Sequence, residues 1–226
     1  MIKLENLDFD EALRYMGCKS REAADSQTLS MMEECEKLVI ENSVPRYRYK
    51  FFEIEKTDDT GIQLKDSTLI LKGNDIRQHL KDCFGIILMC ATLSGKIDAL
   101  IRKTQLEDMT RAVIVNALAS VAIEQLCDKA EVEIYENLDK CYKTWRYSPG
   151  YGDFPIELQK DILTVLDAPR KIGLCTGCSM TLTPIKSVTA VTGLSHKPVS
   201  PRKRGCLSCN LRNTCQYRKV GNHCVQ

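Results

Sequence analysis

The sequence predicts an α+β protein, because strong strand patterns and strong helix patterns occur in one chain. Residues 84–93 are almost wholly apolar, which is typical of a strand covered on both faces. Residues 106–138 hold the longest helical pattern, with a broad apolar stripe. Residues 172–194 are rich in Thr, Val, Ser and Gly and show little helical periodicity, which favours extended structure and turns.

The first half of the chain supplies further elements of both kinds. A short helix is expected after Asp8 or Asp10, either of which can cap it, and Gly17 should end it. A second helix is expected over about 21–41. Residues 47–51 alternate as a half-buried strand does, and we expect their aromatic side chains to lie in the core.

Shorter signals fill the remaining segments. Residues 58–61 form a turn signal and residues 68–71 a strand signal. A short helix should follow, capped by Asn74 or Asp75. Residues 156–166 carry the apolar spacing of an amphipathic helix.

Composition favours an ordinary globular protein of the cytoplasm. Of the 226 residues, 43% are hydrophobic and 27% charged. The first twenty residues contain acids and no apolar run, so we expect no signal peptide, and no run of eighteen apolar residues predicts a membrane span. In a cytoplasmic setting the twelve cysteines favour metal ligation or burial over disulfides. Cys83 and Cys90 are expected to be inert core thiols.

The last 29 residues have a different character, so we divide the chain into a domain over 1–197 and a tail over 198–226. The tail has six Lys or Arg and no acid, whereas the whole chain has a formal charge of only +2. It holds the pattern Cys206-x2-Cys209-x5-Cys215-x8-Cys224. Four thiols this dense, in a segment with few apolar residues, predict a metal centre. Zinc and an iron-sulfur cluster both accept four cysteines.

A second cysteine pair, Cys175-x2-Cys178, lies inside the domain. It is consistent with a redox dithiol, with half of a metal site or with chance spacing.

The candidate ligand site is the stretch from Arg146 to Pro155. Pro149, Gly150 and Gly152 fall within it, so it cannot be the interior of a helix or a strand. An arginine fork suits a carboxylate, glycine lets a ligand approach the backbone, and the Tyr151 ring adds an aromatic face. Such a loop suits a small zwitterion; the alternative is a structural turn with a surface arginine.

The stretch resembles the activation domain of cobalamin-dependent methionine synthase, in which an Arg-x-x-x-Gly-Tyr loop grips S-adenosylmethionine. Arg146, Gly150 and Tyr151 stand at the matching positions. The resemblance runs from about residue 5 to 195 in the family's order. It also rests on Leu7–Phe9, Leu13–Gly17, Ala91–Gly95, Ala117–Glu124, Ser179–Met180, and Pro184 with Ser187–Val188.

The resemblance implies a curved antiparallel sheet surrounded by helices, and it implies roles for the loop residues. Arg146 would hold the carboxylate of S-adenosylmethionine, Ser148 and Gly150 would offer backbone contacts, and Tyr151 would lie near the sulfonium.

Two acidic residues outside the loop are also implied. Glu124, which we expect to be partly buried beside the apolar stripe, would bind the ligand's hydroxyls or ammonium. Asp8 aligns with an acidic residue that contacts the ligand's amino group. No acid-base constellation for catalysis is evident in the sequence.

The function implied is reductive methylation of oxidised, inactive cobalamin, with S-adenosylmethionine as methyl donor. The domain leaves no room for a cobalamin-binding segment, so the chain would be an accessory component of a methyltransferase. It would act in trans on a cobalamin-dependent methionine synthase or another corrinoid protein, with a flavodoxin- or ferredoxin-like electron donor. Because the tail would accompany a redox step, an iron-sulfur cluster is favoured over zinc.

Two other function classes stay open. The cysteines alone would fit a stand-alone iron-sulfur or zinc redox or binding protein. The basic cysteine-rich tail also fits a nucleic-acid-binding module, although Tyr217 is its only aromatic residue and stacking platforms are therefore few.

Overall fold

The computed structural model describes residues 2–18, 21, 24–136, 138 and 141–199. The predicted metal site of the tail lies outside these residues, and the division at 197/198 stays a prediction. Two compact units, each discontinuous in sequence, make up the chain. Unit one comprises residues 1–50, 88–139 and 159–190; unit two comprises 51–87, 140–158 and 191–226.

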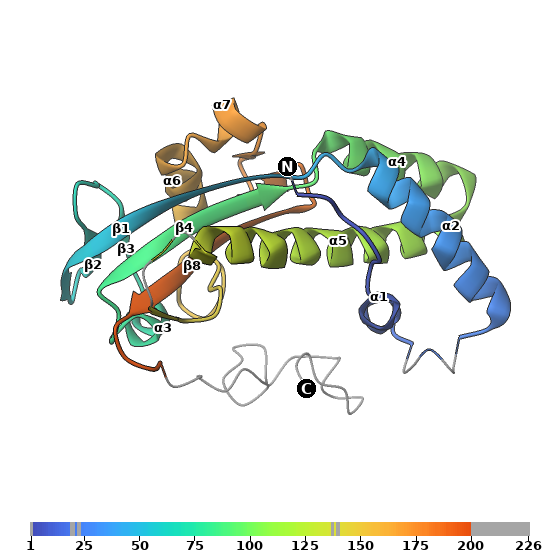
Figure 1. The fold of residues 1–226 in the computed structure, drawn as a ribbon. Coiled ribbons are helices and arrows are strands. Elements are labelled where there is room, and N and C mark those ends of the chain that lie inside the picture. Colours follow the sequence, from blue (N-terminus) through green and yellow to red (C-terminus); the bar gives the residue numbers. More distant parts are fainter. Residues whose placement is uncertain (1, 19–20, 22–23, 137, 139–140, 200–226) are drawn as a thin grey trace. The chain divides into compact units, whose positions relative to one another are not determined.

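The fold is α+β with a curved antiparallel sheet, as the sequence and the resemblance predicted (Figure 1). The strand order is β3-β2-β1-β4-β8-β5, and a separate hairpin pairs β6 with β7. Every residue of β4 is buried, which confirms the strand predicted from the apolar run. The strands are β1 (Arg46–Asp58), β2 (Gly61–Leu64), β3 (Ile70–Leu71), β4 (Gly85–Thr92), β5 (Tyr142–Lys143), β6 (Cys175–Thr176), β7 (Leu182–Thr183) and β8 (Ser187–Ser195).

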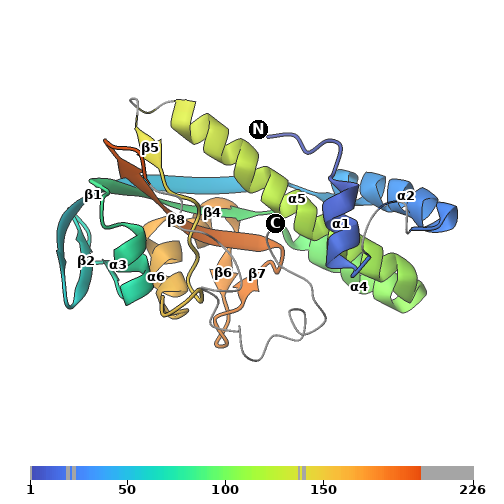
Figure 2. The ribbon, with the colours of Figure 1, turned by 90° about the horizontal axis from the view of Figure 1, so that it is seen from below.

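Unit one is built on one long helix, α5 (Met109–Glu136), against which α1 (Phe9–Tyr15), α2 (Ser26–Asn42) and α4 (Gly95–Glu107) pack. Figure 2 shows α1 lying across α5. By length and composition α5 could cross a membrane, yet 61% of its most apolar window is buried inside the protein, as in a core helix. The unit also holds most of α6 (Leu158–Val165) and α7 (Ala168–Ile172).

The helix predicted over 106–138 is in fact the end of one helix and the whole of another. The chain is extended at Asp108, with φ −156° and ψ 109°, so α4 ends there. The Asp108 carboxylate then accepts the N–H groups of Thr110, at 2.9 Å, and Arg111, at 3.2 Å, and so caps α5. Apolar residues at the junction hid this break, because Leu106 and Met109 extend the pattern although they are 90% and 64% exposed.

Unit two contains the far part of β1, the short strands β2 and β3, the helix α3 (Asn74–His79) and the loop 146–155. β1 turns directly into β2, so the predicted turn at 58–61 is confirmed, whereas β2 was not predicted. The expected cap of α3 is corrected: the N-cap is Gly73, with φ 121° and no side-chain bond of its own.

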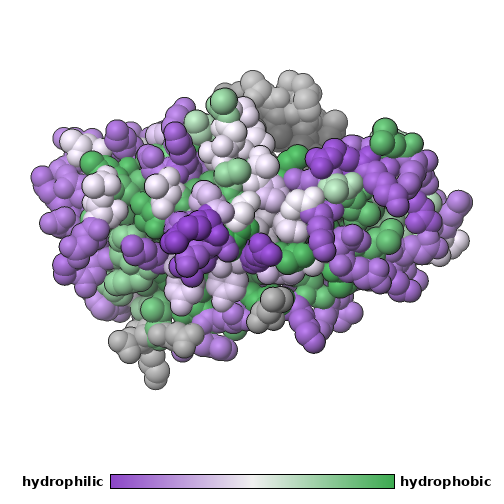
Figure 3. All heavy atoms as spheres, turned by 90° about the horizontal axis from the view of Figure 1, so that it is seen from above, coloured by the Kyte–Doolittle hydropathy of each residue, from purple (hydrophilic) through white to green (hydrophobic). Residues whose placement is uncertain are grey.

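The prediction that the aromatic residues of 47–51 lie in the core was wrong, because Tyr47 is only half-buried and the other two are exposed. Tyr49 and Phe51 are each 40% exposed, and Tyr49 stacks on Tyr47 at a centroid distance of 6.4 Å. These aromatic residues do alternate with charged ones along β1, but the face of the strand that carries them is exposed to solvent. On the face shown in Figure 3, hydrophobic residues likewise appear in groups among hydrophilic ones.

Candidate functional site

The loop 146–155 leaves the sheet at Tyr147 and closes on itself at once. Tyr147 and Val191 exchange both backbone hydrogen bonds, each 2.9 Å. The N–H of Gly150 then donates to the Phe154 carbonyl at 2.8 Å, and the N–H of Tyr151 donates to the Ser148 carbonyl at 3.1 Å. The loop is therefore a shaped structure, as its prolines and glycines predicted. Because the Gly150 N–H is used inside the loop, a backbone contact from Gly150 to a ligand must come from its carbonyl.

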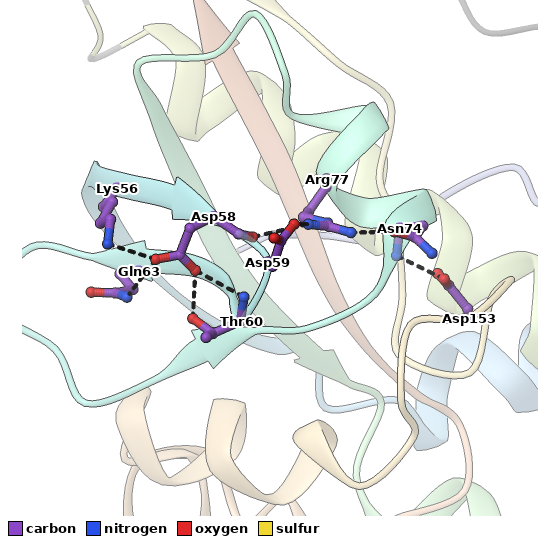
Figure 4. A network of polar contacts seen from close by, with 8 residues as sticks. All are labelled: Lys56, Asp58, Asp59, Thr60, Gln63, Asn74, Arg77 and Asp153. Carbon is purple, nitrogen blue, oxygen red and sulfur yellow. Dashed lines mark hydrogen bonds and ion pairs between the residues drawn. The ribbon is translucent and has the colours of Figure 1, made fainter.

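Asp153 ties this loop to the start of α3 (Figure 4). One carboxylate oxygen accepts the N–H of Asn74 at 2.7 Å, and the other accepts the N–H of Asp75 at 2.8 Å. In return, the N–H of Asp153 donates to the Asp75 carboxylate at 3.3 Å. Asp153 thus supplies, from 78 residues away, the cap that Gly73 cannot, and the backbone bond from Asp75 holds the pKa of Asp153 below its ordinary value.

Two glycines allow the close approach of the loop to α3. A Cβ on Gly73 would lie 2.8 Å from both the carbonyl oxygen and one carboxylate oxygen of Asp153. A Cβ on Gly152, where φ is 55°, would lie 2.7 Å from the Tyr147 hydroxyl and even closer to the Asp75 carboxylate. Neither position has room for a side chain.

The network continues from α3 to the turn between β1 and β2. Arg77 donates to the Asp58 carbonyl at 2.9 Å and also bonds the side chain of Asn74 (Figure 4). The Asp58 carboxylate in turn accepts from Thr60, which fixes the turn. The start of α3 is thus held from one side by the hairpin and from the other by the loop.

Aromatic rings support the loop from beneath. Tyr147 is 6% exposed and lies 5.0 Å from both His79 and Trp145, measured between ring centroids. Phe154, 1% exposed, lies 6.0 Å from Tyr147. Tyr151 meets Tyr147 edge-on at 5.9 Å but is itself 56% exposed. His79, Tyr147 and Phe154 are thus buried together, whereas more than half of the Tyr151 side chain is exposed to solvent.

The predicted ligand residues of the loop differ in exposure. Arg146 is half-buried, and its two neighbours in sequence, Trp145 and Tyr147, contact each other through their rings. Ser148 is half-buried, and Gly150 and Tyr151 are exposed at the turn. A guanidinium and an exposed ring five residues apart, on a hydrogen-bonded turn, can bind a carboxylate and a neighbouring cation.

The two predicted acidic residues belong to unit one. Asp8 is the N-cap of α1, and its carboxylate accepts the Glu11 N–H at 3.0 Å. Glu124 is exposed, so the expectation that it is partly buried was wrong. Glu124 lies on the less buried side of α5, in a row at four-residue spacing with Asn116, Ser120 and Asp128.

Glu124 acts electrostatically on α1. Burial, a hydrogen bond to Glu11 and the charge of Glu124 together raise the pKa of Tyr15 to about 12. The Arg14 guanidinium, which pairs with Glu11, lies 4.9 Å from the Tyr15 ring centroid. Glu11, Arg14 and Tyr15 of α1 thus form a polar cluster on which the charge of Glu124 acts from α5.

Within the described ranges, no group of three or more His, Cys, Asp or Glu is arranged to hold a metal ion. Cys175 and Cys178 are exposed free thiols on the β6–β7 hairpin. Cys90 is fully buried, and burial raises its pKa to about 12, as expected for an inert core thiol. Cys83 is only half-buried and so does not lie in the core as predicted, although burial still raises its pKa to about 11.

Sequence reasoning missed Asp153, Asp75 and Gly73, which shape the loop. The available signal was Asp153 itself, an acidic residue in a glycine-rich turn, where carboxylates often accept backbone N–H groups. Its partner helix, however, is distant in sequence and could not be identified from spacing.

Comparisons with known proteins bear on this geometry. No family model matches the chain, and no curated protein sequence matches it. Among solved structures, 13 chains match. One is the crystal structure of the MetH reactivation domain bound to AdoHcy, with a TM-score of 0.65 over 88% of this chain and 75% of that chain. This chain has that domain's fold. With 15% sequence identity, the likeness shows the fold alone.

Proposed function

We propose that this chain binds S-adenosylmethionine through the loop 146–155 and supports the reductive methylation of oxidised cobalamin on a separate corrinoid protein. The observation that carries the proposal is the fold shared with a MetH reactivation domain that was crystallised with AdoHcy. The Arg146-x-x-x-Gly150-Tyr151 pattern, held on a hydrogen-bonded turn, supports it independently.

The donor set of the loop fits such a ligand. The Arg146 guanidinium would take the carboxylate in a charge-assisted, bidentate contact, the strongest polar contact that the loop offers. The exposed Tyr151 ring would lie beside the sulfonium, where a cation is attracted to an aromatic face. The carbonyl of Gly150 and the backbone of Ser148 would complete the contacts. Binding and orientation of the methyl donor are what these residues contribute to the reaction.

Asp8 and Glu124 are further proposed ligand residues, and their support is the resemblance. Glu124 is exposed on α5, and it would contact the ligand's hydroxyls or an ammonium group. Asp8 already accepts a bond from Glu11, which leaves its second carboxylate oxygen for a ligand amine.

We propose that activity requires a partner in trans, in the cytoplasm. The assay mixes the purified chain with a cobalamin-loaded methionine synthase that lacks its own activation domain, S-adenosylmethionine and a reducing system such as reduced flavodoxin. Formation of methylcobalamin, followed by absorbance, is the expected result. Methylation at the same rate without this chain, or tight binding of cobalamin by the chain alone, would contradict the trans arrangement.

A metal centre on Cys206, Cys209, Cys215 and Cys224 is proposed from the sequence alone, with an iron-sulfur cluster favoured over zinc. Anaerobically purified protein should then contain iron and acid-labile sulfide and absorb broadly near ~400 nm. Replacement of Cys209 by Ser should remove the iron. Stoichiometric zinc without iron or sulfide would refute an electron-relay role for the tail.

A further inference from the structure

The loop that carries Arg146 and Tyr151 is not held by its own turn alone. Its three internal backbone bonds all lie between residues 148 and 154, and the two bonds between Tyr147 and Val191 tie only the start of the loop to the sheet. His79 of α3 also contacts that start, since its Nε2 lies 2.9 Å from the Trp145 carbonyl oxygen. The exposed turn itself contacts α3 through the reciprocal bonds of Asp153 with Asn74 and Asp75.

We propose that Asp153 is a positioning residue for the methyl-donor ligand: by capping α3 it fixes the exposed turn that presents Gly150 and Tyr151. The inference rests on the proposed function for the identity of the ligand. It assigns a role to a residue that the Arg-x-x-x-Gly-Tyr pattern does not include.

Three features of the contact favour a positioning role over an incidental surface bond. Both carboxylate oxygens are used, at 2.7 and 2.8 Å, so the orientation of the Asp153 side chain is fixed. The Asp75 carboxylate also accepts a hydrogen bond from the Asp153 N–H, which fixes the backbone of Asp153 as well. A Cβ on Gly73 would collide with the backbone of Asp153, and a Cβ on Gly152 would collide with the Asp75 carboxylate, so glycine at both positions permits the contact.

The anchor of this contact is itself rigid. Arg77 links the first turn of α3 to the β1–β2 turn through Asn74 and the Asp58 carbonyl. Asp153 thus couples the exposed turn to α3, and loss of its carboxylate would remove the two hydrogen bonds that it accepts from Asn74 and Asp75 while leaving α3 held by Arg77. A loop that spends less time in its binding shape binds more weakly in the same proportion.

The first test is calorimetry with S-adenosylmethionine on the full chain. Loss of an acidic N-cap commonly changes an equilibrium about fivefold, so Asp153→Ala should bind about fivefold more weakly than wild type. Asp153→Asn keeps one acceptor oxygen and turns an N–H₂ toward the other backbone N–H, so its affinity should fall between the two.

Asp25→Ala is the matched control. Asp25 also caps a helix with its carboxylate, accepting the Thr28 N–H at 2.6 Å as the N-cap of α2, but α2 belongs to unit one and carries no proposed ligand residue. It should lose comparable stability and bind S-adenosylmethionine as wild type does. Equal weakening in the Asp25 and Asp153 variants would show that a general loss of stability, and not positioning, is measured.

Hydrogen exchange supplies a readout that needs no ligand. In Asp153→Ala the amides of Gly150, Tyr151 and Phe154 should exchange about fivefold faster, and in Asp25→Ala they should not. Unchanged exchange in Asp153→Ala overturns the inference. If wild type binds and Asp153→Ala binds equally well, the inference fails and the proposed function stands. If wild type does not bind at all, the proposed function fails and takes the ligand role of Asp153 with it.

Discussion

The contact between the loop and α3 predicts unequal costs for two glycine substitutions. Gly152 and Gly173 both have positive φ, 55° and 71°, so an alanine at either is strained by about 1–2 kcal/mol. A Cβ on Gly173 would have no other atom within 4 Å, whereas one on Gly152 would collide with the Asp75 carboxylate and the Tyr147 hydroxyl. The pair thus separates backbone strain from the collision.

The added cost at Gly152 follows from what must move. Tyr147 is buried among aromatic rings and cannot yield freely, so the Asp75 carboxylate has to turn away from the Asp153 N–H. A hydrogen bond to a charged group contributes about 1.5–3 kcal/mol to stability. Because the bond between Asp153 and Asp75 is exposed to solvent, we use the lower value of about 1.5 kcal/mol. We therefore expect Gly152→Ala to lower the free energy of unfolding by about 3 kcal/mol and Gly173→Ala by about 1.5 kcal/mol.

Urea unfolding, followed by circular dichroism, measures both variants against wild type. For a chain of this size the difference also corresponds to a further fall of about 3–6 °C in melting temperature for Gly152→Ala. Equal destabilisation of the two variants would refute the close approach of Gly152 to Asp75, and with it the account of how the loop is held.

The remaining predictions use ionisation and thiol reactivity. Burial and neighbouring carboxylates raise the pKa of Tyr15 and Tyr47 to about 12 from 10.0 in the unfolded chain, so stability should be intact below pH 10 and fall as pH rises from 10 to 12. Ultraviolet titration should show two late-ionising tyrosines; a single transition near pH 10 would contradict this. With iodoacetamide at neutral pH, Cys175 and Cys178 should be alkylated quickly and Cys90 only after unfolding, as followed by peptide mass spectrometry. Labelling of Cys90 in the native protein at the rate of Cys175 would overturn its placement in the core.

The parts of the fold that the sequence predicted are those determined by local pattern. The apolar run became the buried central strand β4, and Asp8 caps α1 as its position before the first apolar turn suggested. The loop 146–155 followed from residues that exclude regular structure. Each of these needed only neighbours within a few residues.

The failures have a common physical reason: long-range contacts decide what local pattern leaves open. α3 is capped by Asp153, from another segment, and not by its own Asn74 or Asp75. β2 is only four residues long and is defined by pairing with its neighbours. Glu124 lies beside buried residues in sequence, yet the packing of α5 turns it outward.

Titration calorimetry with S-adenosylmethionine measures whether Arg146 binds the ligand's carboxylate. Wild type should bind one molecule per chain. Arg146→Ala, which loses a charge-assisted contact of about 1.5–3 kcal/mol, should bind about 10- to 100-fold more weakly. Arg102→Ala, an exposed arginine of α4, is the control and should bind as wild type does. Undiminished affinity in a folded Arg146→Ala variant would contradict the account.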